Sequence, residues 1–285
     1  MVKKRIFFGA LMTALFAGIA IFDGWLDGSL TQTTSDNKEI QGTIFCILLV
    51  LLLSVADLEF ARMAFGRQLI VFVPVSVVTI ILAATGRYWA QLIESRQSDY
   101  LLILFSLALL TSMLFQYIRF GISSLLANCG VNSFAFLYFG VLGYFCIAVR
   151  VEFGLWPLLM YIFVVKCTDI GAYTAGKLFG KHKFSPNISP GKTWEGMAGG
   201  IIFATLVALG FAAAFGIMTL PMAIVFGVGF AFIGQLGDLA ESLLKRDAQQ
   251  KDSANIVPSF GGIMDIIDSP LVAAPFAYLF FMWSS

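Results

Sequence analysis

The chain has 285 residues, of which 59% are hydrophobic and 12% are charged, and its formal net charge is +1. Its mean hydropathy is +0.88. About a quarter of the residues in soluble globular domains are charged, so this composition excludes an ordinary soluble domain. We expect the lipid bilayer, and no nucleic acid, among its partners.

Apolar runs long enough to cross a bilayer, which takes about 20 residues, recur along the whole chain. They lack the period-2 alternation of membrane barrel strands. The sequence therefore predicts an all-α fold, a polytopic integral membrane helical bundle with about nine transmembrane helices. The expected spans are 5–22, 42–59, 69–85, 100–118, 132–149, 155–176, 197–216, 220–238 and 267–283. A broken or re-entrant segment within 119–150 is an alternative.

The distribution of Lys and Arg predicts the orientation of these spans. With Met1–Arg5 in the cytoplasm, most basic residues fall on the cytoplasmic side, and the loops 177–196 and 239–266 lie there too. The opposite side has only Lys38, Arg87, Arg96 and Arg150. Because spans continue after the basic start, we expect a retained first helix and not a cleaved signal. A bacterial-type inner or plasma membrane is the expected location.

Two regions differ in the charge of their spans. Residues 1–150 form an N-terminal transmembrane region with few charges inside it, whereas residues 151–285 bring charged side chains into the membrane. Asp57, Glu59 and Arg62 either mark the interface at a helix end or contribute to a polar pocket. The four cysteines are irregularly spaced, which favours small apolar residues of a helix bundle over disulfides.

The span 155–176 contains two ionisable residues on one helix face, Lys166 and Asp169. Ionisable groups are costly inside a membrane and face a partner or a water-filled cavity. The pair is therefore either a structural ion pair, or Asp169 lines a polar cavity that opens to the cytoplasm.

The loop 177–196 contains Gly191-Lys192-Thr193 just before an expected helix. A phosphate-binding P-loop is excluded, because Pro186 stands where that motif needs Gly and no strand precedes it. The N-terminus of a helix favours phosphate, so Lys192, with help from Ser189 or Thr193, is a candidate phosphate contact.

The stretch 234–268 is rich in charge between two apolar segments. Asp238, Ser242 and Lys245 are spaced to share one helix face, and Asp265 and Asp268 share a face in the first turn of the last helix. Mg²⁺ takes one or two carboxylates together with phosphate oxygens, so Asp238 and Asp265 could hold it between two helices. Acidic residues in a first turn also simply favour the helix dipole, and Glu241 with Lys245 forms an ordinary helical pair.

At these residues the chain resembles the phosphatidate cytidylyltransferases, or CDP-diacylglycerol synthases. That family's pattern runs Ser-x-x-Lys-Arg, Lys-Asp, Pro-x-His-Gly-Gly and Asp-Arg-x-Asp. The matching residues are Ser242-Leu-Leu-Lys245-Arg246, Lys251-Asp252, Pro258-Ser-Phe260-Gly261-Gly262 and Asp265-Ile266-Ile267-Asp268. Upstream matches are Asp169-Ile-Gly-Ala-Tyr173, Gly176-Lys-Leu-Phe-Gly180-Lys181 and Ser189-Pro-Gly-Lys192-Thr193-Trp-Glu195-Gly196.

Two positions depart from the pattern: Phe260 replaces the family's His, and Ile266 replaces its Arg. The first change removes a proton donor or phosphate contact, and the second removes a permanent cation. Either the chemistry does not require them, or other groups replace them, or the activity is altered. The specific resemblance covers 165–285, and the first half resembles the family only in its spans.

The resemblance implies transfer of CMP from CTP to phosphatidic acid, with Mg²⁺ as cofactor. The catalytic candidates are Asp238, Asp265, Asp268, Lys245 and Arg246, of which the three Asp residues would bind the metal. The substrate-binding candidates are Lys192, Ser189, Thr193, Ser242, Lys251, Asp252 and Asp169. The first 150 residues would form the scaffold of a lipid cavity. A homodimer remains open.

Two alternatives stay beside this interpretation. One is a CTP-dependent enzyme that acts on another lipid phosphate. The other is an ion-coupled transporter in which Lys166, Asp169 and Asp238 form an intramembrane relay.

Overall fold

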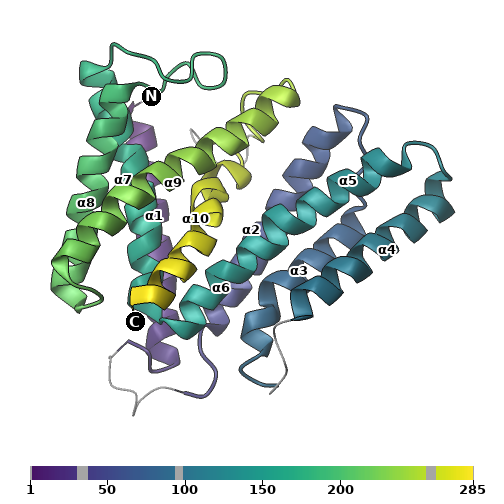
Figure 1. Cartoon of the computed structure of the whole chain (residues 1–285), viewed down its shortest axis with the longest axis horizontal. Coiled ribbons are helices and arrows are strands. Elements are labelled where there is room, and N and C mark those ends of the chain that lie inside the picture. Colours follow the sequence, from purple (N-terminus) through teal and green to yellow (C-terminus); the bar gives the residue numbers. More distant parts are fainter. Residues whose placement is uncertain (1, 31–37, 94–98, 255–260, 285) are drawn as a thin grey trace.

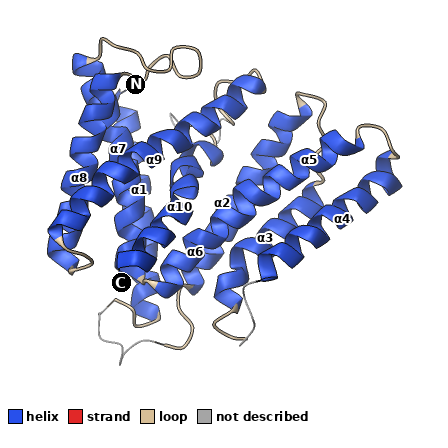
Figure 2. Ribbon diagram, in the orientation of Figure 1, coloured by secondary structure: helices blue, strands red, loops and turns tan. Residues whose placement is uncertain are grey.

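The computed structural model describes residues 2–30, 38–93, 99–254 and 261–284, with side chains from residue 11 onward. Within these residues the regular elements are all helices (Figure 2). They are α1 Val2–Leu26, α2 Thr43–Phe65, α3 Val73–Trp89, α4 Tyr100–Phe120, α5 Leu125–Ala135, the π-helical η3 Phe136–Val141, α6 Leu142–Glu152, α7 Leu155–Phe179, α8 Trp194–Phe215, α9 Leu220–Asp247 and α10 Met264–Ser284.

In the described part of the chain, 7 helical segments are long and apolar enough to cross a membrane. Two shorter apolar helices, Leu11–Leu26 and Val73–Trp89, accompany them. The prediction of an all-α polytopic membrane bundle is therefore confirmed, and the predicted number of about nine is approximate, since it is reached only when both shorter helices are counted.

The region that the sequence left open is one continuous helix. Residues Leu125–Glu152 run through α5, η3 and α6 without interruption. The chain turns before it, at Gly121 with φ 67° and at Ser124 with φ 54°. The alternative of a broken or re-entrant segment is therefore wrong for Leu125–Glu152, which contains instead a π-helical turn that the sequence did not predict.

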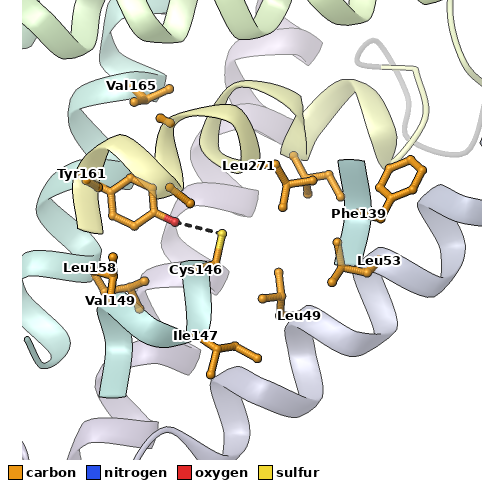
Figure 3. Packing of buried hydrophobic residues seen from close by; sticks show 14 of the residues in the cluster. Leu49, Leu53, Phe139, Cys146, Ile147, Val149, Leu158, Tyr161, Val165 and Leu271 are labelled. Carbon is orange, nitrogen blue, oxygen red and sulfur yellow. Dashed lines mark hydrogen bonds between the residues drawn. The ribbon is translucent and has the colours of Figure 1, made fainter. Parts of the chain in front are cut away.

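The helices form two groups that meet at α10. Figure 1 shows α1, α7, α8 and α9 on one side and α2 to α6 on the other. α10 packs against α7 and α9 of the first group and against α2 and α6 of the second. Side chains of α2, α6, α7 and α10 meet in the core (Figure 3), where the Tyr161 hydroxyl lies 3.2 Å from Cys146 Sγ. All four cysteines are free, as predicted.

The chain's N-terminus, the loop after α7 and the last turn of α9 lie at the same end of the bundle (Figure 1). α10 begins near this end and finishes at the other. The loop between α7 and α8 and the residues that directly follow α9 therefore share one end of the molecule.

α7 and α8 pack closely because glycines line their interface. A Cβ atom at Gly171 would lie 2.8 Å from the Gly199 carbonyl oxygen, and one at Gly196 would lie 2.8 Å from the Ala172 oxygen. Small residues of this kind let membrane helices approach. The close contact continues to Gly200, where a Cβ atom would lie 3.0 Å from the carbonyl oxygen of Thr168, the residue before Asp169, and so holds this part of α7 against α8.

We expect Gly171→Ala to destabilise the fold by about 1–3 kcal/mol, because the added methyl group meets backbone atoms that cannot move aside easily. Gly210→Ala in α8 is the matched control, since a Cβ there would have no atom within 4 Å. The midpoint of thermal unfolding in detergent should fall only for Gly171→Ala. Equal midpoints for the two variants would contradict this account of the interface.

At the opposite end of the bundle, Arg150 joins three segments. Its guanidinium is fully buried, with NH2 2.8 Å from Asp23 Oδ2 and 2.6 Å from Asp27 Oδ2. The same nitrogen donates to Ser29 Oγ at 3.0 Å. Asp23 also accepts from the backbone N–H of Ile44, at 2.8 Å, in the first turn of α2. This buried polar network fixes the ends of α1, α2 and α6 to one another.

Candidate active site

A polar cluster lies where α7, α9 and α10 meet. Lys166 Nζ on α7 lies 3.9 Å from Asp169 Oδ2 and 3.7 Å from Asp268 Oδ1 on α10. Gln235 Nε2 on α9 donates to Asp169 Oδ1 at 3.3 Å. The pair that the sequence placed on one helix face is therefore connected to both neighbouring helices, and is more than a self-contained ion pair.

Three carboxylates converge at the centre of the cluster: Asp238 and Glu241 from one face of α9, and Asp268 from α10. One oxygen of each lies within 4.8 Å of the others. Glu241 and Asp268 are buried, and Asp238 is half-buried. Among the described residues, Glu241 Oε1 has no hydrogen-bond partner. Buried carboxylates this close repel one another, and hard oxygen donors in this arrangement fit a divalent cation.

Three lysines from three different segments surround these carboxylates. Lys192 Nζ, from the loop before α8, lies 2.6 Å from Asp238 Oδ2. Lys245 Nζ, on α9, lies 2.5 Å from Glu241 Oε2, and Lys166 Nζ approaches Asp268 as described above. The arrangement thus alternates anionic and cationic groups, and it has the donors and acceptors needed to bind phosphate oxygens beside a cation.

Asp265 lies beside the three-carboxylate group and is not part of it. Its Oδ1 meets Lys245 Nζ at 2.5 Å, and its Oδ2 accepts from the Gly262 N–H at 2.8 Å and from the Ser253 hydroxyl at 2.7 Å. The pairing that the structure displays is Asp238 with Asp268 and Glu241, which differs from the predicted Asp238 with Asp265. The first turn of α10 directs Asp265 toward the preceding loop, and a role for it as a metal ligand stays a prediction.

Comparison with known proteins identifies the chain's relatives. A model of the cytidylyltransferase family matches residues 37–284. The chain belongs to this family. It is similar to the phosphatidate cytidylyltransferase of Haemophilus influenzae, with 42% identity over 131 residues, which are 44% of this chain and 46% of the relative. The corresponding protein of Bacillus subtilis is 41% identical over 155 residues, 52% of this chain and 56% of the relative. That of Pseudomonas aeruginosa is 38% identical over 138 residues, 46% of this chain and 50% of the relative. The chain spans about half the length of the curated relatives it matches.

The family membership confirms the resemblance found in the sequence. Together with the apolar helices and the bacterial relatives, it establishes an integral membrane protein. The matched region includes the three carboxylates and the three lysines of the polar cluster.

Glu59 supports the site from α2, outside the region where the sequence placed the chemistry. This fully buried carboxylate accepts from the backbone N–H groups of Ile263, at 2.8 Å, and Met264, at 2.9 Å, at the start of α10. The Ser253 hydroxyl also lies 3.0 Å from Glu59 Oε2, and it can donate its single proton either to Glu59 or to Asp265. Glu59 thus satisfies free N–H groups at the helix N-terminus. The sequence offered it as one member of a polar pocket, without naming the partner.

Three predicted site residues, the substrate-binding candidates Thr193 and Ser189 and the catalytic candidate Arg246, take part in the loops around the cluster. Thr193 is the N-cap of α8, and its hydroxyl accepts from the Gly196 N–H at 3.1 Å. The Ser189 carbonyl accepts from the Lys192 N–H at 3.1 Å and closes the turn that presents Lys192. Arg246 donates through Nε to the Ile188 carbonyl at 3.1 Å, and so connects α9 with that turn.

The remaining predicted residues lie at the edge of the site. Ser242 is buried on α9, and Lys251 and Asp252 are exposed in the turn after α9. Ile266, which replaces the family's Arg, is half-buried against the apolar core. Pro258 and Phe260 lie outside the described residues.

Proposed function

We propose that this chain transfers CMP from CTP to phosphatidic acid and gives CDP-diacylglycerol and pyrophosphate. The observation that supports this best is the group Asp238, Glu241 and Asp268, surrounded by three lysines, inside a helical membrane protein of the cytidylyltransferase family. The similar proteins of three bacteria have the name phosphatidate cytidylyltransferase, which fits the same reaction.

The proposed reaction needs no strong general base. An oxygen of the ionised lipid phosphate forms a bond to the α-phosphorus of CTP, the bond between that phosphorus and the bridging oxygen of the β-phosphate breaks, and pyrophosphate leaves. Positioning and neutralisation of charge are then the main tasks of the protein. Asp238, Glu241 and Asp268 would hold Mg²⁺. The ion would neutralise charge on the phosphate oxygens of CTP.

The lysines would bind the phosphates themselves. Lys192 belongs to the loop between α7 and α8, and this loop lies at the end of the bundle where CTP would enter (Figure 1), so we assign it to the triphosphate. Lys245 and Lys166 each lie between two carboxylates, and they can exchange one of these partners for a phosphate oxygen. In each case an ammonium group already positioned by carboxylates meets the substrate, so little conformational entropy is lost on binding.

The proposed topology has the N-terminus and both long loops in the cytoplasm of a bacterial-type inner membrane. The positive-inside distribution of Lys and Arg supports it. The location of the N-terminus and the loops at one end of the bundle also fits this topology (Figure 1). CTP would then enter from the cytoplasm, and residues 1–150 would form the scaffold of a cavity in which the acyl chains of the lipid remain within the bilayer.

The proposal is tested with the purified chain in mixed micelles that contain phosphatidic acid, with CTP labelled on the α-phosphorus in one sample and on the γ-phosphorus in another. We expect Mg²⁺-dependent lipid-soluble label only from α-labelled CTP, together with release of pyrophosphate. Label from γ-labelled CTP would instead indicate a lipid kinase. Absence of lipid-soluble label with phosphatidic acid and with other lipid phosphates would exclude the synthase and leave the transporter.

A further inference from the structure

Tyr138 is a buried residue whose hydroxyl has no hydrogen-bond partner among the described residues. It is 8% exposed and lies near the middle of the spanning helix Leu125–Glu152. The hydroxyl of a buried tyrosine normally finds a partner, because leaving it unpaired in an apolar region costs free energy. A hydroxyl without one in the protein alone is therefore expected to meet a bound molecule.

The surroundings of Tyr138 indicate which molecule. Its helix turn η3 packs against α10, and the phenol lies within electrostatic range of Asp268, Glu241 and Asp238. These are the three carboxylates of the cluster. Tyr138 therefore borders the cluster on the side of the first 150 residues, whereas Lys192 borders it on the side of the long loops.

The ring of Tyr138 is held in place by its neighbours. Phe134 stacks on it with 5.5 Å between ring centroids, and Phe139 meets it edge-on at 5.2 Å. The residue lies in the π-helical turn Phe136–Val141, a geometry that is rare and found frequently at functional sites. This turn changes the direction of the side chains that follow it, so a straight α-helix would present a different residue toward α10.

We propose that Tyr138 contacts the substrate, its hydroxyl donating a hydrogen bond to a phosphate oxygen of the acceptor lipid. This inference depends on the proposed function. The hydroxyl acts as a donor because a phenol ordinarily keeps its proton at neutral pH. The lipid phosphate is the assigned acceptor because Tyr138 lies near the middle of a spanning helix, at the depth of the bilayer, and not in the loops from which CTP would enter.

The test is Tyr138→Phe, which keeps the ring and removes only the hydroxyl. A hydrogen bond to a charged phosphate predicts a fall of about 10- to 100-fold in kcat/KM for phosphatidic acid at saturating CTP. The KM for CTP and the Mg²⁺ concentration at half-maximal activity should stay within about twofold. The midpoint of thermal unfolding should not fall, because the hydroxyl has no described partner to lose.

Tyr161→Phe is the matched control, because Tyr161 is also buried and its hydroxyl already has Cys146 Sγ as a partner (Figure 3). It should leave kcat/KM for phosphatidic acid unchanged. Unaltered kinetics in Tyr138→Phe would overturn the inference, and so would a shift in Mg²⁺ dependence, which would assign the hydroxyl to a metal-bound water instead.

A second readout separates this inference from the proposed function. Stabilisation of the protein by phosphatidic acid without CTP should be weaker for Tyr138→Phe than for the unmodified chain and for Tyr161→Phe. If the unmodified chain lacks turnover, the proposed function fails while this binding measurement still tests Tyr138. If it turns over and Tyr138→Phe matches it in both measurements, only the inference about Tyr138 fails.

Discussion

Replacing Arg150 with Met is expected to lower the free energy of unfolding by about 3–5 kcal/mol, because two buried carboxylates would lose their shared cation. Asp23 and Asp27 both contact the Arg150 NH2 nitrogen, and all three side chains are buried. The loss would also release Asp23 from its fixed position at the start of α2. The measurement is the unfolding midpoint in detergent as denaturant is added.

Arg87→Met is the control for this prediction. Arg87 forms an ion pair with Glu152 at 2.5 Å at the same end of the bundle, but about a quarter of each side chain is exposed. Ion pairs that water reaches contribute about 0–1 kcal/mol, so the midpoint should change little. Arg150→Lys should fall between the two, because Arg150 reaches Asp23 through Nε as well as NH2, and a single ammonium group cannot reproduce this planar arrangement. Equal effects for Arg87→Met and Arg150→Met would refute the special role of the buried network.

The same network predicts that the folded protein loses stability at acidic pH. Burial raises the pKa of Asp27, but hydrogen bonds from Ser29 and Gly42, with the charge of Arg150, lower it below its ordinary value of 3.8. A carboxyl with a lowered folded-state pKa stabilises the fold above that ordinary value, and the contribution disappears as pH falls through the folded-state value. We expect the acid-dependent loss of stability below pH about 4 to be smaller in Arg150→Met than in the unmodified chain.

The fold could be predicted from the sequence because its main determinant is local. Apolar runs of the right length specify spanning helices whatever they pack against. The π-helical turn at Phe136–Val141 was not visible in this way, since one extra residue in a turn leaves the hydropathy of a span unchanged. For the same reason, the sequence could not predict Tyr138 as a site residue. Its position beside the cluster depends on that turn and on the packing of α10.

The sequence predicted part of the site. The residues that it missed depend on contacts between helices that are far apart in the chain. Helical spacing placed Asp238 and Lys245 on one face of α9. Glu241 was not predicted as a site residue, because its i,i+4 spacing from Lys245 is already explained by an ordinary ion pair on a helix surface. The structure shows Glu241 buried beside Asp268, which only the crossing of α9 and α10 determines. Glu59 was harder to predict, because its contact with the start of α10 joins the second helix of the chain to the last.

Asp268→Asn is expected to abolish most Mg²⁺-dependent transfer and to raise the Mg²⁺ concentration at half-maximal activity. Changes to residues that merely support metal ligands cost about 10- to 100-fold, so loss of this proposed ligand carboxylate should lower kcat/KM by more than about 100-fold. The folded protein should remain, because Asn fills the same volume and one of three mutually repelling charges is removed. Stabilisation of the protein by Mg²⁺ in thermal unfolding should weaken in parallel.

Asp265→Asn distinguishes the site in the structure from the pairing expected from sequence. Its carboxylate meets Lys245 and the loop residues Ser253 and Gly262, outside the group Asp238, Glu241 and Asp268. An amide cannot accept from all of these donors, so turnover should fall while the Mg²⁺ concentration at half-maximal activity and the Mg²⁺-dependent stabilisation stay unchanged. If Asp265→Asn instead shifts both Mg²⁺ measurements as Asp268→Asn does, then Asp265 is itself a ligand and the cation lies nearer Lys245 than the three-carboxylate group implies.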